Sequence, residues 1–117
     1  RNMATFSKHF LSGSTNGRQI KVTANASPGT AIHTPDSTGT DEIWLYATNQ
    51  DTVSVDLTVE YGGTTSPDDK ITLSVPSKSG LTLVVLGLII SGSGNPVRAF
   101  ASTGSVVMIS GYVNRIT

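Results

Sequence analysis

Apolar and polar residues alternate along most of the chain, with the period of a β-strand that buries one face. The clearest case is segment 53–61, where Val, Leu and Tyr alternate with Ser, Asp, Thr and Glu. Arg18–Ala26 and Ile71–Val75 alternate in the same way. Nowhere does the period change to the 3.6 residues of a helix. The pattern therefore predicts an all-β chain.

Three segments are apolar on both faces: Asp41–Asn49, Leu81–Ile90 and Val106–Ile116. A strand of this kind is typically covered by the core on one side and by a neighbour on the other. We therefore expect Leu81–Ile90 and Val106–Ile116 to be strands covered on both sides. Segments 41–49 and 53–61, separated by a short polar stretch, are expected to pair as a hairpin.

Gly, Pro and Asn separate the predicted strands at spacings of roughly 8–12 residues. Such spacing indicates a single jelly-roll-like β-sandwich of about eight antiparallel strands over residues 1–117. Segment 27–40 holds two prolines and two glycines and is expected to be a long loop, with a short extended piece at Ala31–His33. Residues 3–12 form either the first strand or an N-terminal arm.

Composition narrows the classes of partner. Only 14% of the residues are charged, and eight basic residues balance eight acidic ones. The long-range field that would attract nucleic acid or an anionic membrane is therefore lacking, and we expect neither as a partner. The longest apolar run is about half the length of a membrane-spanning helix. The first residues do not have the pattern of a secretory signal, and without cysteine there is no thiolate chemistry.

No motif in the sequence indicates catalysis, so we expect a protein that is not an enzyme and needs neither a metal nor a cofactor. The imidazoles are His9 and His33, and neither belongs to a nucleophile–base motif. His33 lies near Asp36, Asp41 and Glu42. We interpret this stretch as a solvated polar loop, because the spacing of metal ligands is missing.

Two further acidic pairs have simple interpretations. Asp56 and Glu60 share one strand face but stand about 13 Å apart along it, which is too far for glycoside hydrolysis. We expect that face to be solvated. Asp68 and Asp69 follow Pro67 in a turn, where their carboxylates cap backbone amides. A calcium-binding loop is the alternative.

The surplus of apolar positions is the strongest functional signal. A two-layer sandwich has room for one apolar face per strand, so the remainder would form an exposed patch of the kind that marks interfaces. We expect the contacts with a second copy or another partner to come from Phe6, Phe10, Leu11, Trp44, Tyr46, Met108 and Tyr112. The alternative is a platform at Trp44 and Tyr46 on which sugar rings stack, which would make the domain a carbohydrate-binding module.

Three stretches resemble small β-sandwich structural proteins from the virions of tailed bacteriophages. They are Met3–Val22 (MATFSKHFLSGSTNGRQIKV), Asp41–Asn49 (DEIWLYATN) and Ile109–Ile116 (ISGYVNRI). The resemblance implies a head decoration, or cement, protein on the capsid exterior. Such a protein binds the major capsid protein or another virion protein as a homo-oligomer, and we favour a trimer. Head–tail joining and tail proteins share these features and stay as the alternative.

Overall fold

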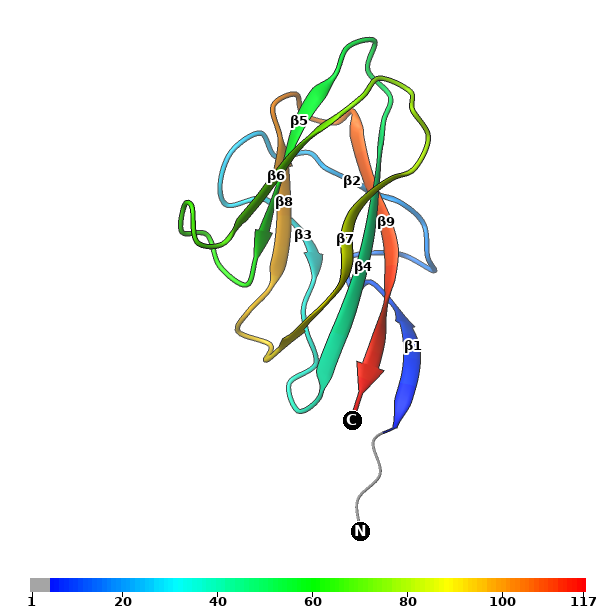
Figure 1. Ribbon diagram of the computed structural model, residues 1–117, viewed down its shortest axis with the longest axis vertical. Helices are drawn as coiled ribbons and strands as arrows, with labels where there is room; N and C mark the ends of the chain where they lie inside the picture. The colour runs from blue at the N-terminus through cyan, green and yellow to red at the C-terminus, as the bar shows by residue number, and fades with distance from the viewer. Residues whose placement is uncertain (1–4) are drawn as a thin grey trace.

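The computed structural model describes residues 5–117, and these form nine strands without a helix (Figure 1). The strands are β1 (Phe6–Phe10), β2 (Ile20–Lys21), β3 (Thr30–His33), β4 (Thr40–Asn49), β5 (Val55–Tyr61), β6 (Lys70–Val75), β7 (Thr82–Ser91), β8 (Val97–Ala101) and β9 (Val107–Ile116). The predicted all-β class is confirmed. The predicted extended piece within segment 27–40 is β3.

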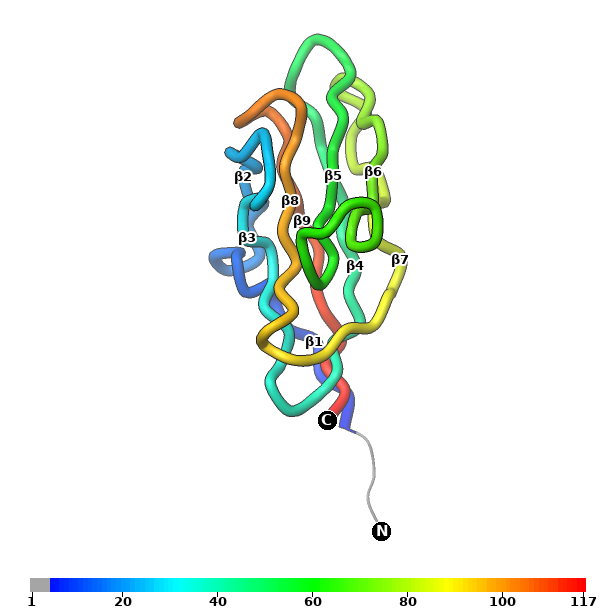
Figure 2. The backbone as a smooth tube through the Cα atoms, turned by 90° about the vertical axis from the view of Figure 1, so that its left-hand side faces the viewer, coloured from blue at the N-terminus to red at the C-terminus, as the bar shows by residue number. Residues whose placement is uncertain are grey.

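The strands form two antiparallel sheets that pack face to face (Figure 2). The five-stranded sheet has the order β1-β9-β4-β7, and β2 also pairs with β9. The four-stranded sheet has the order β3-β8-β5-β6. Leaving out β1, the orders β2-β9-β4-β7 and β3-β8-β5-β6 are those of a jelly roll with two Greek keys. The predicted sandwich is therefore confirmed, with β1 as an additional strand.

The core lies between the sheets and consists of the inward positions of each alternating strand. On β4, Ile43, Leu45 and Ala47 are fully buried, whereas Trp44 and Tyr46 between them are partly exposed. The central strands β5, β8 and β9 repeat this pattern. Each fully buried aliphatic side chain contributes about 1.5–3 kcal/mol relative to an exposed one. Burial of these faces is therefore the main force that holds the two sheets together.

Strands β4 and β5 do not form the predicted hairpin. Strand β4 pairs with β7 and β9, and β5 pairs with β6 and β8, so the connection between them passes from one sheet to the other. Asn49 anchors this corner: its Nδ2 donates to the backbone carbonyls of Val53 and Val75, each at 2.9 Å. Its Oδ1 accepts from the Asp51 N–H at 2.9 Å. The alternation was misleading because the same side chains face the core whether the two strands pair in a hairpin or lie in opposite sheets.

The predicted strand over Arg18–Ala26 is also a crossing. Only the two residues of β2 pair with β9. The backbone N–H of Val22 still donates to Val107 at 2.9 Å, but the Ala24 carbonyl accepts from Ala101 of β8 at 3.1 Å. The chain therefore leaves one sheet for the other within a few residues.

The two ends of the described chain lie side by side. Within residues 3–12, Phe6–Phe10 form β1 along β9, and residues 3 and 4 lie outside the described part. The pairing extends to the last residue: the Thr5 N–H donates to the Thr117 carbonyl at 2.8 Å, and the Thr117 N–H donates back at 2.9 Å. Both ends therefore sit at one end of the molecule (Figure 1).

Strand β7 is an edge strand, and within the described part of the single chain no neighbour covers its outer face. Within residues 5–117 it pairs with β4 alone. Five large apolar side chains in and next to it are 40–64% exposed: Leu81, Leu83, Leu86, Leu88 and Ile89. Only Val84 and Val85 are buried in the core. A run of apolar residues has the same sequence pattern whether a neighbour covers it or not.

Candidate functional site: the outer face of the five-stranded sheet

The large side chains predicted to make contacts gather on the outer face of the five-stranded sheet. The strand register places Phe10 opposite Tyr112, Tyr112 opposite Trp44, and Trp44 opposite Leu86. Directly opposed side chains have Cβ atoms about 4.5–5.5 Å apart. These four residues, which we call the aromatic row, therefore form a band across four strands, from β1 to β7.

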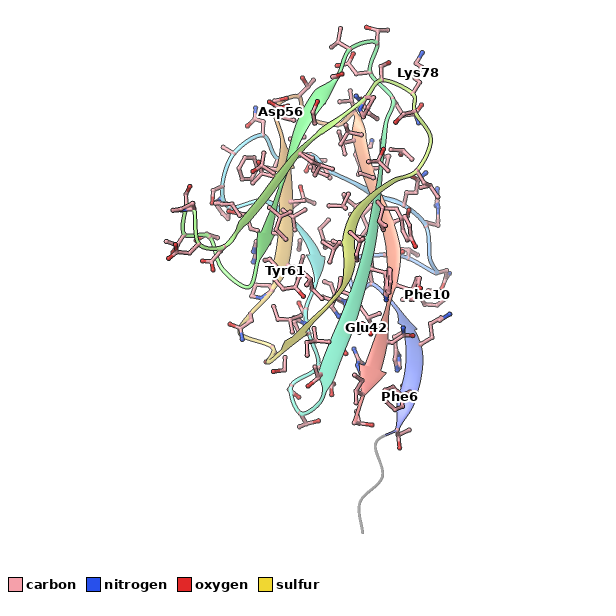
Figure 3. The ribbon with its side chains drawn as sticks, in the orientation of Figure 1. Phe6, Phe10, Glu42, Asp56, Tyr61 and Lys78 are labelled. Atoms are coloured by element: carbon pink, nitrogen blue, oxygen red, sulfur yellow. The ribbon has the colours of Figure 1, made fainter. Side chains whose placement is uncertain are left out.

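Three other predicted residues lie on the same face as the aromatic row. Tyr46 is opposite Leu83 on β7, and Met108 is opposite Lys21 on β2. Phe6 lies four pairs from Phe10 along β1, at one edge of the molecule (Figure 3). The sequence thus identified one side of the sheet, although the three strands that carry these residues are far apart in the chain.

Leu11 is the exception, and its assignment to an interface is wrong. It is 1% exposed and belongs to the core. Because Leu11 directly follows Phe10, the last residue of β1, its side chain points to the opposite side of the backbone. One side chain therefore lies on the outer face and the next lies between the sheets.

Two glycines make room for the aromatic row. Gly87 has φ of +78°, and a Cβ atom there would lie 2.8 Å from the Trp44 indole. Gly17 has φ of +83°, and a Cβ atom there would lie 3.2 Å from the Phe10 ring. The pairing of β4 with β7 also shifts register beside Trp44. The indole can therefore lie over the backbone of β7.

Polar contacts hold the centre of the row. The rings of Trp44 and Tyr112 are stacked, with centroids 6.4 Å apart and planes at 14°. Glu42 Oε1 accepts from Asn114 Nδ2 at 2.9 Å and from Trp44 Nε1 at 2.8 Å. These two hydrogen bonds lower the pKa of Glu42. Lys8 Nζ lies 4.7 Å from the Tyr112 ring centroid, a cation–π contact. The row is thus ordered before any partner binds.

Two shallow hollows lie where β1 and β2 meet β9. The first has a volume of about 500 Å³ and is lined by Lys8, His9, Phe10, Gly17, Gly111 and Tyr112. The second has a volume of about 620 Å³ and is lined by Gly17, Arg18, Gln19, Lys21, Gln50 and Met108. Both volumes fall in the range of ordinary ligand sites, about 300–1,000 Å³.

His33 is not part of a solvated loop, so that interpretation is wrong. Both His33 and Asp41 are buried, and His33 Nε2 lies 2.7 Å from Asp41 Oδ2. The Ser12 backbone N–H donates to His33 Nδ1 at 2.9 Å. A backbone N–H can only donate, so Nδ1 accepts and Nε2 carries the proton. Arg115 Nε donates to Asp41 Oδ1 at 2.9 Å.

The His33–Asp41–Arg115 cluster joins β3, β4 and β9 of the two sheets. Burial raises the pKa of Asp41, but hydrogen bonds from Arg115 and His33 outweigh burial and hold this pKa below its usual value. A buried carboxylate needs such partners, because an unpaired charge in the interior is costly. We therefore assign the cluster to the stability of the fold.

Glu60 is also buried, which corrects the expectation of a solvated face at Asp56 and Glu60. Asp56 is exposed, but the segment that holds Ser27 and Gly29 covers Glu60. Glu60 accepts from Ser27 Oγ at 2.5 Å, from the Gly29 N–H at 2.6 Å and from Lys70 Nζ at 2.5 Å. Burial raises the pKa of Glu60, and these bonds, that from Lys70 first, outweigh burial and lower it.

Asp68 and Asp69 lie in a turn, as the sequence predicted. The Asp69 carboxylate accepts from the Thr65 N–H at 3.1 Å, the predicted capping. Among residues 5–117, no three His, Asp or Glu side chains form a group that could hold a metal ion. Over the same range, no helix is long and apolar enough to cross a membrane.

Sequence reasoning missed two parts of this face. It named no residue of β7 for the exposed patch, although Leu86 belongs to the aromatic row and Leu83 and Ile89 extend it along the free edge. It also treated the basic residues singly, whereas the register brings Lys8 and Lys21 onto one face along β9. The only available signal was alternation within each segment, which does not reveal neighbours in the sheet.

The sequence matches no family model, and neither a curated protein nor a solved structure matches it. The functional argument therefore rests on the geometry of the outer face.

Proposed function

We propose that the protein is a non-enzymatic structural protein of a virion, which docks onto its particle as an oligomer through the β7 side of the outer face. The resemblance of its opening, central and closing stretches to phage virion proteins favours a decoration protein on the capsid exterior. A position at the head–tail junction or in the tail would use the same face. Jelly rolls are a common fold of viral capsid proteins, which supports this class of function.

The exposed apolar side chains of β7 carry the proposal. Leu83, Leu86 and Ile89 project from the same face of the strand, beside Trp44 and Tyr46. Single apolar residues on a surface are ordinary, but a contiguous patch of this kind marks an interface. Removing such a patch from water yields about 25 cal/mol per Å². An assembly that covers β7 is therefore favoured.

The free edge of β7 points to the same conclusion. Natural edge strands are usually protected by charged residues or by proline. No charged residue occurs from Leu81 to Val97, and β7 itself contains no proline. Two copies can therefore meet here without repulsion between like charges. On a lattice, many such contacts add through their effective concentration.

Light scattering of the purified protein and co-sedimentation with undecorated phage capsids test the proposal. We expect the wild type to self-associate and to sediment with capsids. Leu86→Asp and Ile89→Asp should both shift the protein to a monomer and abolish sedimentation. Val53→Asp is the matched control, because Val53 is 60% exposed but lies in the β4–β5 connection.

Two outcomes would contradict the proposal. In the first, the wild type stays monomeric across the concentration range and none of the variants differs from it. In the second, Val53→Asp weakens association as much as the β7 variants do, which would show a general effect of added charge rather than a specific surface.

A further inference from the structure

The two hollows adjoin each other and form one groove along β9. Gly17 lines both of them. Tyr112 in the first and Met108 in the second are four positions apart on the same strand face, which corresponds to about 13 Å. Strands β1 and β2 both pair with β9 along the edge that does not pair with β4. We call this feature the edge groove, and it lies at the opposite edge of the sheet from β7.

All the charged side chains of the edge groove are basic. Lys8, Arg18 and Lys21 line it, and no Asp or Glu does. The ion pairs among residues 5–117 are made by other cations, namely Lys70 and Arg115. The three groove cations are exposed and have no carboxylate partner in that range. In a chain of zero net charge, this is a local concentration of positive charge.

The groove also offers rings and amides. Phe10 is 61% exposed and lies opposite Tyr112. Aromatic rings of this kind can pack against the apolar face of a sugar ring. Gln19 Oε1 accepts from Thr48 Oγ1 at 2.9 Å, so the amide NH₂ of Gln19 is directed to other acceptors. With Gln50, it supplies amide groups suited to sugar hydroxyls.

We propose that the edge groove binds an acidic polysaccharide, a chain of sugars that carry carboxylate or sulfate groups. The sugar rings pack on the exposed ring of Phe10, and the anionic groups pair with Lys8, Arg18 and Lys21. The guanidinium of Arg18 can hold a carboxylate or a sulfate with two hydrogen bonds. This site is separate from the platform at Trp44 and Tyr46 considered from the sequence.

A polysaccharide fits the groove better than nucleic acid does. Proteins that bind single strands without sequence preference combine stacking rings with an extended basic groove, and their affinity depends on neutralising many phosphates. Here the chain as a whole is neutral and three cations line the groove. Ion pairs with acidic groups that are spaced along a sugar chain act at short range, so they do not require a strong long-range electrostatic field. The site is independent of assembly through β7, because the two lie on opposite edges of the sheet.

Isothermal titration calorimetry with four probes tests the proposal. The probes are oligogalacturonate, which carries carboxylates, a heparin oligosaccharide, which carries sulfates, a neutral cello-oligosaccharide, and single-stranded DNA. We expect binding to at least one acidic glycan and none to the neutral one, and the stronger of the two acidic ligands identifies the anionic group. Affinity should fall as salt rises, because exposed charges are screened.

Variants locate the binding site. The double variant Arg18→Gln/Lys21→Gln should lower the affinity about tenfold or more, the effect of losing hydrogen bonds between charged groups. Phe10→Ala should lower it several-fold. Lys78→Gln is the control for charge, since Lys78 is exposed but does not line the groove. Phe6→Ala is the control for the ring, because Phe6 is exposed on the same strand but does not line the groove.

The proposal is overturned if neither acidic glycan binds, if the control variants lower affinity as much as the groove variants, or if single-stranded DNA binds more tightly than both glycans. All substituted side chains are exposed, and equal thermal melting of the variants verifies that the fold is intact. Oligomeric state is measured in the same samples. Loss of glycan binding with unchanged self-association separates this proposal from the one for β7.

Discussion

At the scale of single residues, the Tyr61 hydroxyl is the one buried side-chain polar atom in residues 5–117 that has no hydrogen-bond partner. Its ring packs against the core, as the alternation of segment 53–61 predicted. Burial raises the pKa of Tyr61 to about 12. A buried hydroxyl without a partner loses its hydration and gains nothing in return.

Tyr61→Phe should therefore be at least as stable as the wild type, with a gain of up to about 1 kcal/mol in the free energy of unfolding. Urea denaturation at neutral pH measures it. The folded pKa of Tyr61 lies above the ordinary value of 10.0, so ionisation of this hydroxyl favours the unfolded chain. The wild type therefore keeps its full stability below pH 10 and loses part of it as the pH rises toward about 12. The Phe variant should lose less stability over that range. A loss of more than about 1 kcal/mol at neutral pH would mean that the hydroxyl has a partner.

The buried carboxylates show where prediction from sequence stops. Alternation correctly put Glu60 on the outward face of its strand, yet its partners Ser27 and Gly29 are 33 and 31 residues away. Asp41 was expected in a solvated stretch, although its partner Arg115 is 74 residues away. Pairing over such distances follows from topology, and local pattern carries no information about it.

At the scale of elements, Gly111 determines how closely β9 approaches β4. Its φ is +149°, and a Cβ atom there would overlap the Trp44 carbonyl oxygen at 1.9 Å. The obstacle is backbone in a central pair of strands, which cannot move without breaking the ladder. A glycine at this position therefore sustains the pairing that supports the aromatic row.

Gly111→Ala should lower the free energy of unfolding by about 3 kcal/mol or more. The matched control is Gly80→Ala: Gly80 has φ of +80° but no atom within 4 Å of its added Cβ, so it bears only the backbone strain. That strain costs about 1–2 kcal/mol. Chemical denaturation of both variants measures the difference. If both variants lose the same free energy of unfolding, the close approach of β9 to β4 does not contribute to stability.

The strands themselves were easier to predict than their partners. Segments 41–49, 53–61 and 106–116 all form strands close to the expected bounds, because period-two burial is a local property. Sheet membership is not local, and the expected hairpin between the first two was wrong for that reason. Likewise, the apolar run of β7 suited a central strand and an uncovered edge equally well.

At the scale of the whole molecule, two buried carboxylates each link several parts of the fold. Asp41 connects β3, β4 and β9, and Glu60 connects β5 and β6 to the segment at Ser27. The folded pKa of each lies below its ordinary value, 3.8 for Asp41 and 4.5 for Glu60. Their contribution to stability is therefore present above those values and is lost as the pH falls through the lowered folded pKa values.

The protein should accordingly lose stability in acid below about pH 4. Thermal melts between about pH 2 and pH 7 measure the loss. Asp41→Asn and Glu60→Gln should each melt at a lower temperature at neutral pH and depend less on pH than the wild type. Asp56→Asn, at an exposed carboxylate, should keep the wild-type profile. If the wild type melts at one temperature throughout, the two carboxylates do not stabilise the fold.

The pairing of Thr5 with Thr117 makes the chain almost a closed ring. Termini that lie close together tolerate circular permutation, so a short linker could join these two and new ends could open in the exposed turn at Ser93–Asn95. The same geometry means that cargo joined at Thr5 or at Thr117 emerges from one pole of the molecule. Both the β7 edge and the edge groove run along the sides of the sheet, which leaves that pole available for display.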